Sequence, residues 1–421
     1  MTSKLKELIA KLCPNGVEYH SLEELFVIKN GYTPSKSNSE FWTDGTVPWF
    51  RMDDIRAHGR VLSDSIQHVT KSAVKGGKLF PANSIILATT ATIGEHALVI
   101  VDSLANQQFT FFSKRESLSF DLDMKYVFYY FFIIDEWCKR NVNAASFASV
   151  DMPRLRKLEI PVPPLDVQAE IVRILDTFTE LTAELTAELT ARKKQYEYYR
   201  DTLLTFDDNN PLYSLISRYC PNGVEYKKIG DIATDVFRGY GIKKDQVTST
   251  GIPCVRYGEI YTKYSLWFDS CFSHTDESLI TNKKYFEHGD ILFAITGESV
   301  EDIAKSCVYV GNEKCLAGGD IVVVKHSQNP KYLSYALSTT DARLQKSSGK
   351  VKSKVVHASA ESIKGITIPV PPLEVQRQIV QILDRFDALC NDLTQGLPAE
   401  IEARKKQYEY YRDQLLTFKR A

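Results

Sequence analysis

The sequence predicts an α+β protein with an internal pseudo-twofold repeat, in which two strand-rich domains of mixed α and β structure are separated by two long antiparallel helices forming a coiled coil. Duplicated blocks, in the same order in each half, predict this arrangement. Residues 191–206 and 403–418 match at 15 of 16 positions, and a 19-residue block from Ile160 returns from Ile368 with 14 identities. Because the copies lie 212 and 208 residues apart, the repeat is a duplicated domain and not a solenoid.

The composition predicts a folded globular chain. Its 421 residues are 43% apolar and 25% charged, with a net charge of −1, so they can bury two or more cores. We find no apolar run long enough for a membrane helix and no signal-peptide pattern after Met1, so we expect a cytoplasmic protein. The eight cysteines form no C-x-x-C pair, so we expect free thiols and no zinc site. The net charge by itself does not point to nucleic acid.

Each half begins with a short amphipathic helix that a Pro-Asn-Gly turn ends, and the surrounding heptapeptide Cys13–Tyr19 recurs unchanged as Cys220–Tyr226. Short β-type runs separated by Gly, Asn and Ser follow in each half, and one further helix is expected before the shared proline block. The expected strands are 47–50, 84–88, 108–112, 252–255, 290–294 and 320–324, and the expected helices are 124–140 and 332–345. We therefore place the strand-rich domains at residues 1–159 and 208–367.

The proline blocks at Ile160 and Ile368 open the two helical regions, which we place at residues 160–207 and 368–421. Residues 165–206 contain no Pro or Gly and carry an apolar stripe at helical spacing, which predicts a helix of roughly 60 Å. Its copy, residues 373–418, contains Gly396-Leu397-Pro398, which predicts a break and a restart at Ala399. Helices this long need partners, so we expect them to pair; the alternative is that each lies on its own domain.

The first helix contains a tandem repeat, Thr182-Ala183-Glu184-Leu185 and then the same four letters from Thr186 to Leu189. Each unit adds about one helical turn, ~6 Å, without disturbing the apolar stripe. Two interpretations stay open, a spacer whose length changes in whole units and a simple low-complexity helix.

Catalytic motifs are missing from the sequence. It has no G-x-x-x-x-G-K-[ST] loop for ATP and no nucleophile elbow. Asp121, Asp123 and Lys125 have a spacing that a metal-dependent nuclease uses, but we interpret them as solvated loop charges. The segment from Asn209 to Tyr213 faintly resembles the Asn-Pro-Pro-Tyr loop of amino-methyltransferases, without its second proline. We therefore expect a chain that is not an enzyme by itself and holds no metal or cofactor.

Taken together, the repeated motifs resemble the specificity subunit of Type I restriction–modification enzymes over essentially the whole chain. The resemblance rests on the two proline blocks with the following Gln-x-x-Ile-Val-x-Ile-Leu-Asp, the Arg-Lys-Lys-Gln-Tyr-Glu-Tyr-Tyr-Arg-Asp helix ends and the tandem Thr-Ala-Glu-Leu units. Gly31-Tyr32-Thr33-Pro34-Ser35, followed by Phe41-Trp42 and Val47-Pro48-Trp49, also looks like the start of a target recognition domain of that family.

The resemblance implies a DNA-reading scaffold. Each variable domain would recognise one half of a bipartite, asymmetric double-stranded DNA site, and the Thr-Ala-Glu-Leu units would set the gap between the halves. Two methyltransferase subunits and two ATP-dependent restriction subunits would complete the complex and would carry S-adenosylmethionine, ATP and Mg. Two other hypotheses stay open: a scaffold that clamps two protein ligands without DNA, and an enzyme with an unrecognised active site.

Candidate contact residues follow from aligning the halves. Arg51 and Arg256 take matched positions after a strand and suit bidentate contacts to guanine, although a salt bridge to Asp53, Asp54 or Glu259 is an equal alternative. The other candidates for DNA contact lie in polar loops: Thr33, Ser35, Lys36, Arg238, Tyr240, Lys243, Lys244, Lys350 and Lys352. The candidates for docking partner subunits, whose tyrosines have the alternative of packing on the opposite helix, are Arg192, Lys193, Tyr196, Tyr199, Arg200, Arg404, Lys405, Tyr408, Tyr411 and Arg412.

Overall fold

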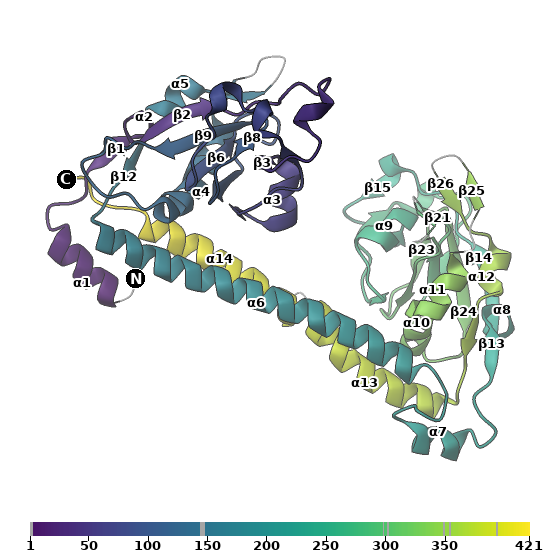
Figure 1. Cartoon of the computed structure of the whole chain (residues 1–421). Coiled ribbons are helices and arrows are strands. Elements are labelled where there is room, and N and C mark those ends of the chain that lie inside the picture. Colours follow the sequence, from purple (N-terminus) through teal and green to yellow (C-terminus); the bar gives the residue numbers. More distant parts are fainter. Residues whose placement is uncertain are drawn as a thin grey trace. The chain divides into compact units, whose positions relative to one another are not determined.

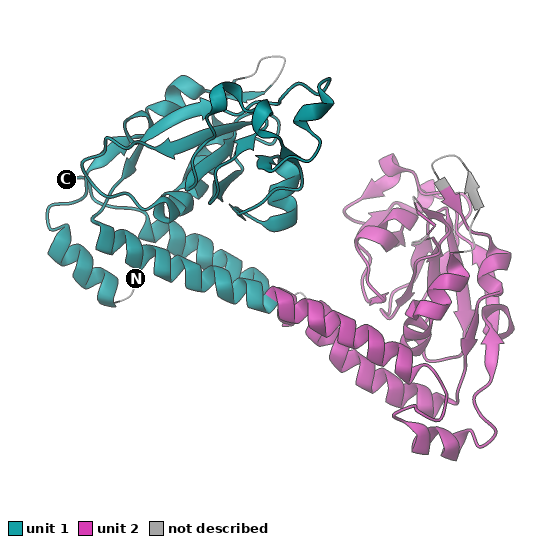
Figure 2. Cartoon of the chain, in the orientation of Figure 1, with its two compact units in different colours: residues 1–185, 401–421 teal, residues 186–400 magenta. Residues whose placement is uncertain are grey.

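The computed structural model describes residues 3–143, 148–297, 299–300, 303–347, 350–352, 355–392 and 395–421. The chain forms two compact units (Figure 2). Unit 1 contains Met1–Leu185 and Ile401–Ala421, and unit 2 contains Thr186–Glu400. Each unit is a mixed α/β domain with a pair of long helical segments, so the predicted α+β class with an internal repeat is confirmed.

Unit 1 is built on a five-stranded sheet in the order β2-β9-β6-β7-β4, in which only β4 pairs parallel to its neighbour. Figure 1 labels β2, β9 and β6 of this sheet. Helix α4 packs on this sheet, where the rings of Phe26, Phe112 and Phe131 meet edge to face. The elements are α1 (Ser3–Leu12), β1 (Tyr19–Ser21), α2 (Leu22–Leu25), β2 (Phe26–Asn30), β3 (Val47–Phe50), α3 (Met52–His58), β4 (Val61–Leu62), β5 (His68–Val69), β6 (Ser84–Ala88), β7 (His96–Val99), β8 (Leu104–Ala105), β9 (Phe109–Lys114), α4 (Met124–Arg140), β10 (Val142–Asn143), β11 (Ser149–Val150), α5 (Met152–Arg156) and β12 (Glu159–Pro161).

Unit 2 repeats this sheet as β14-β24-β20-β22-β17, with α10 against β22 as α4 lies against β7. Its elements are α7 (Tyr213–Tyr219), β13 (Tyr226–Lys228), α8 (Ile229–Ile232), β14 (Ala233–Arg238), β15 (Val247–Thr248), β16 (Ile252–Val255), α9 (Tyr257–Thr262), β17 (Trp267–Phe268), β18 (Ser273–Thr275), β19 (Tyr285–Phe286), β20 (Ile291–Ala294), β21 (Thr296–Gly297), β22 (Ser306–Tyr309), β23 (Cys315–Ala317), β24 (Ile321–His326), α10 (Pro330–Ser338), α11 (Thr340–Lys346), β25 (Lys350–Lys352), β26 (Val355–His357), α12 (Ala360–Lys364) and β27 (Thr367–Pro369). A second sheet, β15-β18-β16-β23-β19, corresponds to the smaller β5-β3-β8 sheet of unit 1.

The helix expected at residues 124–140 is confirmed as α4. The helix expected near residues 332–345 is in fact two helices, α10 and α11. Thr339 separates them because its extended backbone ends the first helix, while its side chain accepts a hydrogen bond from the amide of Ala342 and so caps the second. A threonine between two helical segments is a weak local signal, which is why the pattern predicted one helix.

The long helical segments follow the sequence closely. Helix α6 (Leu165–Leu203) runs without interruption from unit 1 into unit 2. The second segment is broken, as predicted, into α13 (Leu373–Asn391) and α14 (Leu397–Leu415). At Gly396 a Cβ atom would lie 2.6 Å from the carbonyl oxygen of Ala388, so the close approach at the break requires glycine. Helix α14 restarts at Leu397, two residues before the expected position.

In each unit, part of α6 packs antiparallel on a part of its own copy. In unit 1 the ring of Phe178 stacks on Tyr411 with centroids 5.6 Å apart, and in unit 2 Phe386 stacks on Tyr199 at 5.3 Å. Phe178 and Phe386 are matched positions of the repeat, as are Tyr199 and Tyr411. The phenylalanine of each helix copy therefore stacks on the tyrosine of the other copy. Tyr199 and Tyr411 thus pack against the opposite helix.

A duplicated polar contact fixes the helix pairs to the domains. The carboxylate of Asp176 accepts hydrogen bonds from Lys125 Nζ at 2.7 Å and Tyr129 OH at 2.5 Å. In unit 2, Asp384 accepts from Lys331 and Tyr335, each at 2.8 Å. The interpretation of Lys125 as a solvated loop charge is therefore wrong, because Lys125 lies in α4 and its ammonium group pairs with Asp176.

Replacing Asp384 with alanine is expected to lower the free energy of unfolding of unit 2 by about 2 kcal/mol, since the buried Tyr335 hydroxyl loses its acceptor. Hydrogen exchange along α10 measures this directly. The control is Glu374→Ala, which removes a partly exposed pair with Arg377 and should cost less than about 0.5 kcal/mol. Unchanged exchange in α10 of the Asp384→Ala protein would contradict the prediction.

Acid sensitivity of unit 2 is expected from His326 at the end of β24. Burial lowers the pKa of this imidazole to about 4. Below the unfolded pKa of about 6.5 the unfolded chain binds a proton that the folded chain does not, so stability falls as the pH drops from 6.5 to 4, by up to about 3 kcal/mol. Denaturant unfolding at pH 7 and pH 5 should show this loss, and His326→Gln should reduce it. If the unchanged protein and the His326→Gln variant lose the same stability, groups other than His326 cause the loss.

Candidate nucleic-acid interface

The two units share a frame at the ends of β2 and β14, where each strand passes into a Gly-Tyr pair. The amide of Tyr32 donates to Ala105 O at 2.8 Å, and that of Tyr240 donates to Ala317 O at 3.0 Å. A Cβ atom at the preceding glycine, Gly31 or Gly239, would overlap a backbone carbonyl of the neighbouring segment. These glycines bring the following polar loops against the β3–β8 strand pair of unit 1 and the β16–β23 pair of unit 2.

Arg51 and Arg256 take matched places between a strand and a helix. Arg51 follows β3 and precedes α3, and its backbone amide donates to Asp54 Oδ2 at 2.6 Å. Arg256 follows β16 and precedes α9, and its amide donates to Glu259 Oε2 at 3.0 Å. Both acids are buried, so the backbone of each arginine is fixed.

The guanidinium groups of both arginines lie near carboxylates but at long range. Arg51 Nη2 lies 3.7 Å from Asp53 Oδ2, and Arg256 Nε lies 3.6 Å from Glu259 Oε1. The side chains are 33% and 34% exposed. Among the residues that the structure describes, neither side chain donates a hydrogen bond to a carboxylate. The alternative of a salt bridge is therefore present only as a weak ion pair at each arginine. Each guanidinium group keeps N–H donors for a ligand.

Unit 1 has a groove of about 550 Å³ that brings together three predicted contact residues, Thr33, Lys36 and Arg51. Trp49, over which Arg51 lies at 5.7 Å, forms part of its wall. The fourth candidate of this loop, Ser35, does not line the groove; its carbonyl accepts from the indole of Trp42 at 3.0 Å. Cations, hydroxyls, amides and indole rings line the groove, and no acid is among its described lining residues.

Three amide side chains of this groove were missed by the sequence analysis: Gln67, Asn106 and Gln107. Gln107 Oε1 accepts from the hydroxyl of Thr33 at 2.5 Å, which ties the two loops together. Asn and Gln are the side chains that make bidentate hydrogen bonds to adenine. The run Asn106-Gln107-Gln108 was the available signal, and the parallel pairing of β3 with β8 is what brings it beside Arg51.

The matched groove of unit 2, about 500 Å³, has different chemistry. Arg256 lines it beside Lys263 and two acids, Glu259 and Asp320. Lys263 lies over the exposed ring of Phe272 at 4.2 Å. The two units therefore present unlike surfaces at the same place in the repeat.

The other candidates of unit 2 lie around this groove. Arg238 pairs with Asp320, and Lys243, Lys244 and Tyr240 are exposed at the loop. Lys350 and Lys352 belong to β25, which pairs with β26, but their side chains lie outside the described part of the structure.

The helix-end candidates divide into buried and exposed residues. In unit 2, Tyr196 and Arg200 are buried and Tyr199 is half-buried, while Arg192 and Lys193 are exposed. In unit 1, Lys405 is exposed and the others are half-buried: Arg404, Tyr408, Tyr411 and Arg412. Arg192, Lys193 and Lys405 are therefore the candidates exposed to solvent.

None of the helices that the structure describes is long and apolar enough to cross a membrane. In the same residues, no group of three or more His, Cys, Asp or Glu side chains is placed to hold a metal ion.

Comparison with known proteins identifies the family. The family model for the Type I restriction modification DNA specificity domain matches residues 14–192 and 221–403. The chain is 38% identical, over 90% of both chains, to the Type I restriction enzyme EcoprrI specificity subunit of Escherichia coli. It is 32% identical to the EcoR124I/EcoR124II specificity subunit of Escherichia coli, over 70% of this chain and 71% of that one.

A solved structure described as the structural basis underlying complex assembly and conformational transition of the type I R-M system shares the fold, with a TM-score of 0.64, 17% identity, and 96% and 98% of the two chains covered. The two family-model matches fall on the two halves of the repeat, as the sequence analysis predicts. The chain therefore belongs to the DNA specificity subunits of type I restriction–modification systems.

Proposed function

We propose that each unit reads one half of a bipartite, asymmetric double-stranded DNA site, with the recognition domains at residues 1–159 and 208–367. The observation that carries this proposal is the pair of unlike grooves at matched places on one duplicated frame. A shared frame gives both units the same mode of approach to DNA, and unlike linings give them different half-sites. Catalysis then belongs to partner subunits, which would work in the cytoplasm, where the DNA is.

The lining of each groove suits a different pattern of base edges. In unit 1, Arg51 suits guanine, Asn106 and Gln107 suit adenine, and Lys36 suits a phosphate. In unit 2, a carboxylate such as Asp320 would accept from the cytosine amino group beside an arginine that suits guanine. Hydrophobic walls such as Trp49 position the polar groups and exclude water.

The duplicated helix ends supply two equivalent docking sites for two methyltransferase subunits, and two restriction subunits would complete the complex. Near-identical sequence with exposed Arg192, Lys193 and Lys405 is what two copies of one partner in pseudo-twofold positions require. S-adenosylmethionine, ATP and Mg would be bound by these partners. The described residues of this chain offer no cluster for a metal.

Methylome sequencing of cells that carry this chain and its partner subunits tests the proposal, because it reports both half-sites and their spacing together. The expected result is one bipartite motif with two unlike halves. A single continuous motif, or no motif that depends on this chain, would overturn it. Methylation by the purified chain alone would overturn the assignment of catalysis to the partners.

A further inference from the structure

The surroundings of helix α4 in unit 1 and of helix α10 in unit 2 differ in a way that DNA recognition does not explain. The contacts of Asp176 with Lys125 and Tyr129 match those of Asp384 with Lys331 and Tyr335, so α4 and α10 are equivalent helices. Counting along them, Phe132 of α4 corresponds to Ser338 of α10.

The strand registers extend this equivalence. Val61 pairs with Leu98 in unit 1, as Trp267 pairs with Val308 in unit 2. The residue before each short strand and the first residue of each longer strand are therefore matched too: Arg60 with Leu266, and His96 with Ser306. At three neighbouring positions, unit 1 has a large side chain where unit 2 has a smaller one.

In unit 1 these large side chains fill the space, and the carboxylate of Asp135 pairs with two of them. The ring of Phe132 has the guanidinium of Arg60 at 5.1 Å and that of Arg412 at 5.3 Å. The carboxylate of Asp135 lies 2.7 Å from His96 Nδ1 and 3.4 Å from Arg60 Nη1. In unit 1 the carboxylate of Asp135 is thus the anion that lies beside these side chains.

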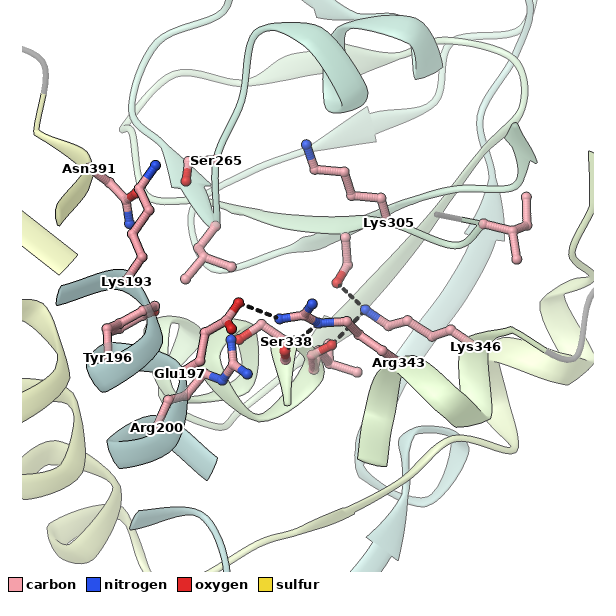
Figure 3. Close-up of a pocket in the computed structure, with 14 residues that line it drawn as sticks. Lys193, Tyr196, Glu197, Arg200, Ser265, Lys305, Ser338, Arg343, Lys346 and Asn391 are labelled. Carbon is pink, nitrogen blue, oxygen red and sulfur yellow. Dashed lines mark hydrogen bonds and ion pairs between the residues drawn. The ribbon is translucent and has the colours of Figure 1, made fainter. Parts of the chain in front are cut away.

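In unit 2 the smaller residues leave a cavity of about 370 Å³ at the end of α6 (Figure 3). Lys193 and Arg200 of α6 line one side, and Arg343 and Lys346 of α11 line the other. Among the described lining residues, Glu197 is the acid, and it lies 3.6 Å from Arg343. The cavity is therefore cationic.

Several donors of this cavity are buried. Lys346 is 8% exposed and donates to Ser306 Oγ at 2.9 Å and Leu337 O at 2.7 Å, which leaves its third proton. Burial lowers the pKa of this amine to about 7. The hydroxyl of Tyr196, which is 6% exposed, makes no hydrogen bond with any described residue. A buried hydroxyl without a partner is unfavourable unless a ligand or water completes it.

We propose that this cavity binds the phosphate group of a small molecule, whose charge the cationic side chains would neutralise. Lys193, Arg200, Arg343 and Lys346 would surround the phosphate, and the Tyr196 hydroxyl would donate to it. The cavity lies in the range of ~300–1,000 Å³ that is usual for small-molecule sites, so it holds more than a bare ion. A nucleotide has the required size and charge.

Calorimetric titration of the purified full chain with adenosine 5′-monophosphate, inorganic phosphate and adenosine tests this proposal. The expected result is that adenosine 5′-monophosphate binds and is displaced by phosphate, while adenosine does not bind. Binding of phosphate without the nucleotide would identify free phosphate as the source of the same anion. If adenosine binds as well as its phosphate ester, or if neither anion binds, the proposal is overturned.

Variants locate the binding. Ser338→Phe introduces the side chain that unit 1 has at this position and should abolish binding. Lys193→Gln on the exposed face of α6 is expected to leave the fold unchanged, and it should weaken binding by about tenfold. Its neighbour Lys194 is also exposed but does not line the cavity, so Lys194→Gln is the matched control. If Lys193→Gln and Lys194→Gln bind the nucleotide with equal affinity, the proposed location of the site in this cavity is overturned.

Discussion

Deletion of Thr186–Leu189 is expected to move the methylated site to one whose non-specific spacer is about one base pair shorter, with both half-sites unchanged. These residues lie inside α6, which is continuous from one unit to the other. Removing four residues shortens a helix by ~6 Å and turns it by about 40° beyond a full turn. One base pair of DNA turns by about 34°, since 10 to 10.5 pairs complete a turn. The rotation therefore favours a change of one pair.

Methylome sequencing of the deletion strain gives the new spacing directly. The matched control is Thr186→Ala, which keeps the length of α6 and should leave the spacing as it was. Methylation of the original site by the deletion variant would contradict a role of α6 length in spacing. It would favour the interpretation of the repeat as a simple low-complexity helix.

Replacement of Arg51 with alanine is expected to relax recognition at one base pair of one half-site. A bidentate arginine contributes ~1–3 kcal/mol of discrimination, so preference at that position should fall by about 10- to 100-fold while the other half-site is unaffected. Competition binding of the assembled complex to duplexes randomised in one half-site measures the change. The corresponding Arg256→Ala variant should affect the other half-site.

The control for this variant lies on α3, the helix that follows Arg51. Arg56 of α3 is 64% exposed and lies 3.8 Å from Asp53, the same acid that Arg51 approaches. Arg56→Ala should leave the sequence preference intact. If Arg51→Ala weakens binding equally for every sequence, Arg51 contacts a phosphate; if it changes neither affinity nor preference, the ion pair with Asp53 is structural.

Local chain properties explain what the sequence predicted correctly. Prolines from Ile160 and the uninterrupted run to Phe206 predicted α6, and Gly396 predicted the break between α13 and α14. Three residues that line the unit 1 groove were among the predicted DNA contacts: Thr33 and Lys36 from their polar loop, and Arg51 from the alignment of the two halves. Gln107 was not, because its place beside Thr33 depends on a strand pairing between residues more than 50 positions apart.

The buried polar contacts of the repeat were not predictable for the same reason. Nothing near Lys125 in sequence indicates that Asp176 is its partner. The difference between Phe132 and Ser338 is visible in the sequence, but its consequence depends on the side chains packed around each position. Sequence repeats thus predict the frame, and three-dimensional contacts determine what each copy of the frame holds.

The division of unit 1 between distant parts of the chain sets an order of events during protein synthesis. The hydroxyl of Tyr19 donates to Phe418 O, 399 residues away, and Val17 bridges to Arg420. Unit 2 is one contiguous stretch and is able to fold as soon as it leaves the ribosome. Unit 1 cannot close until residue 420 has been made, which at ~5–20 residues per second is a wait of tens of seconds for a domain translated first. During that interval the apolar residues of unit 1 that Leu415 and Leu416 later cover stay in contact with water.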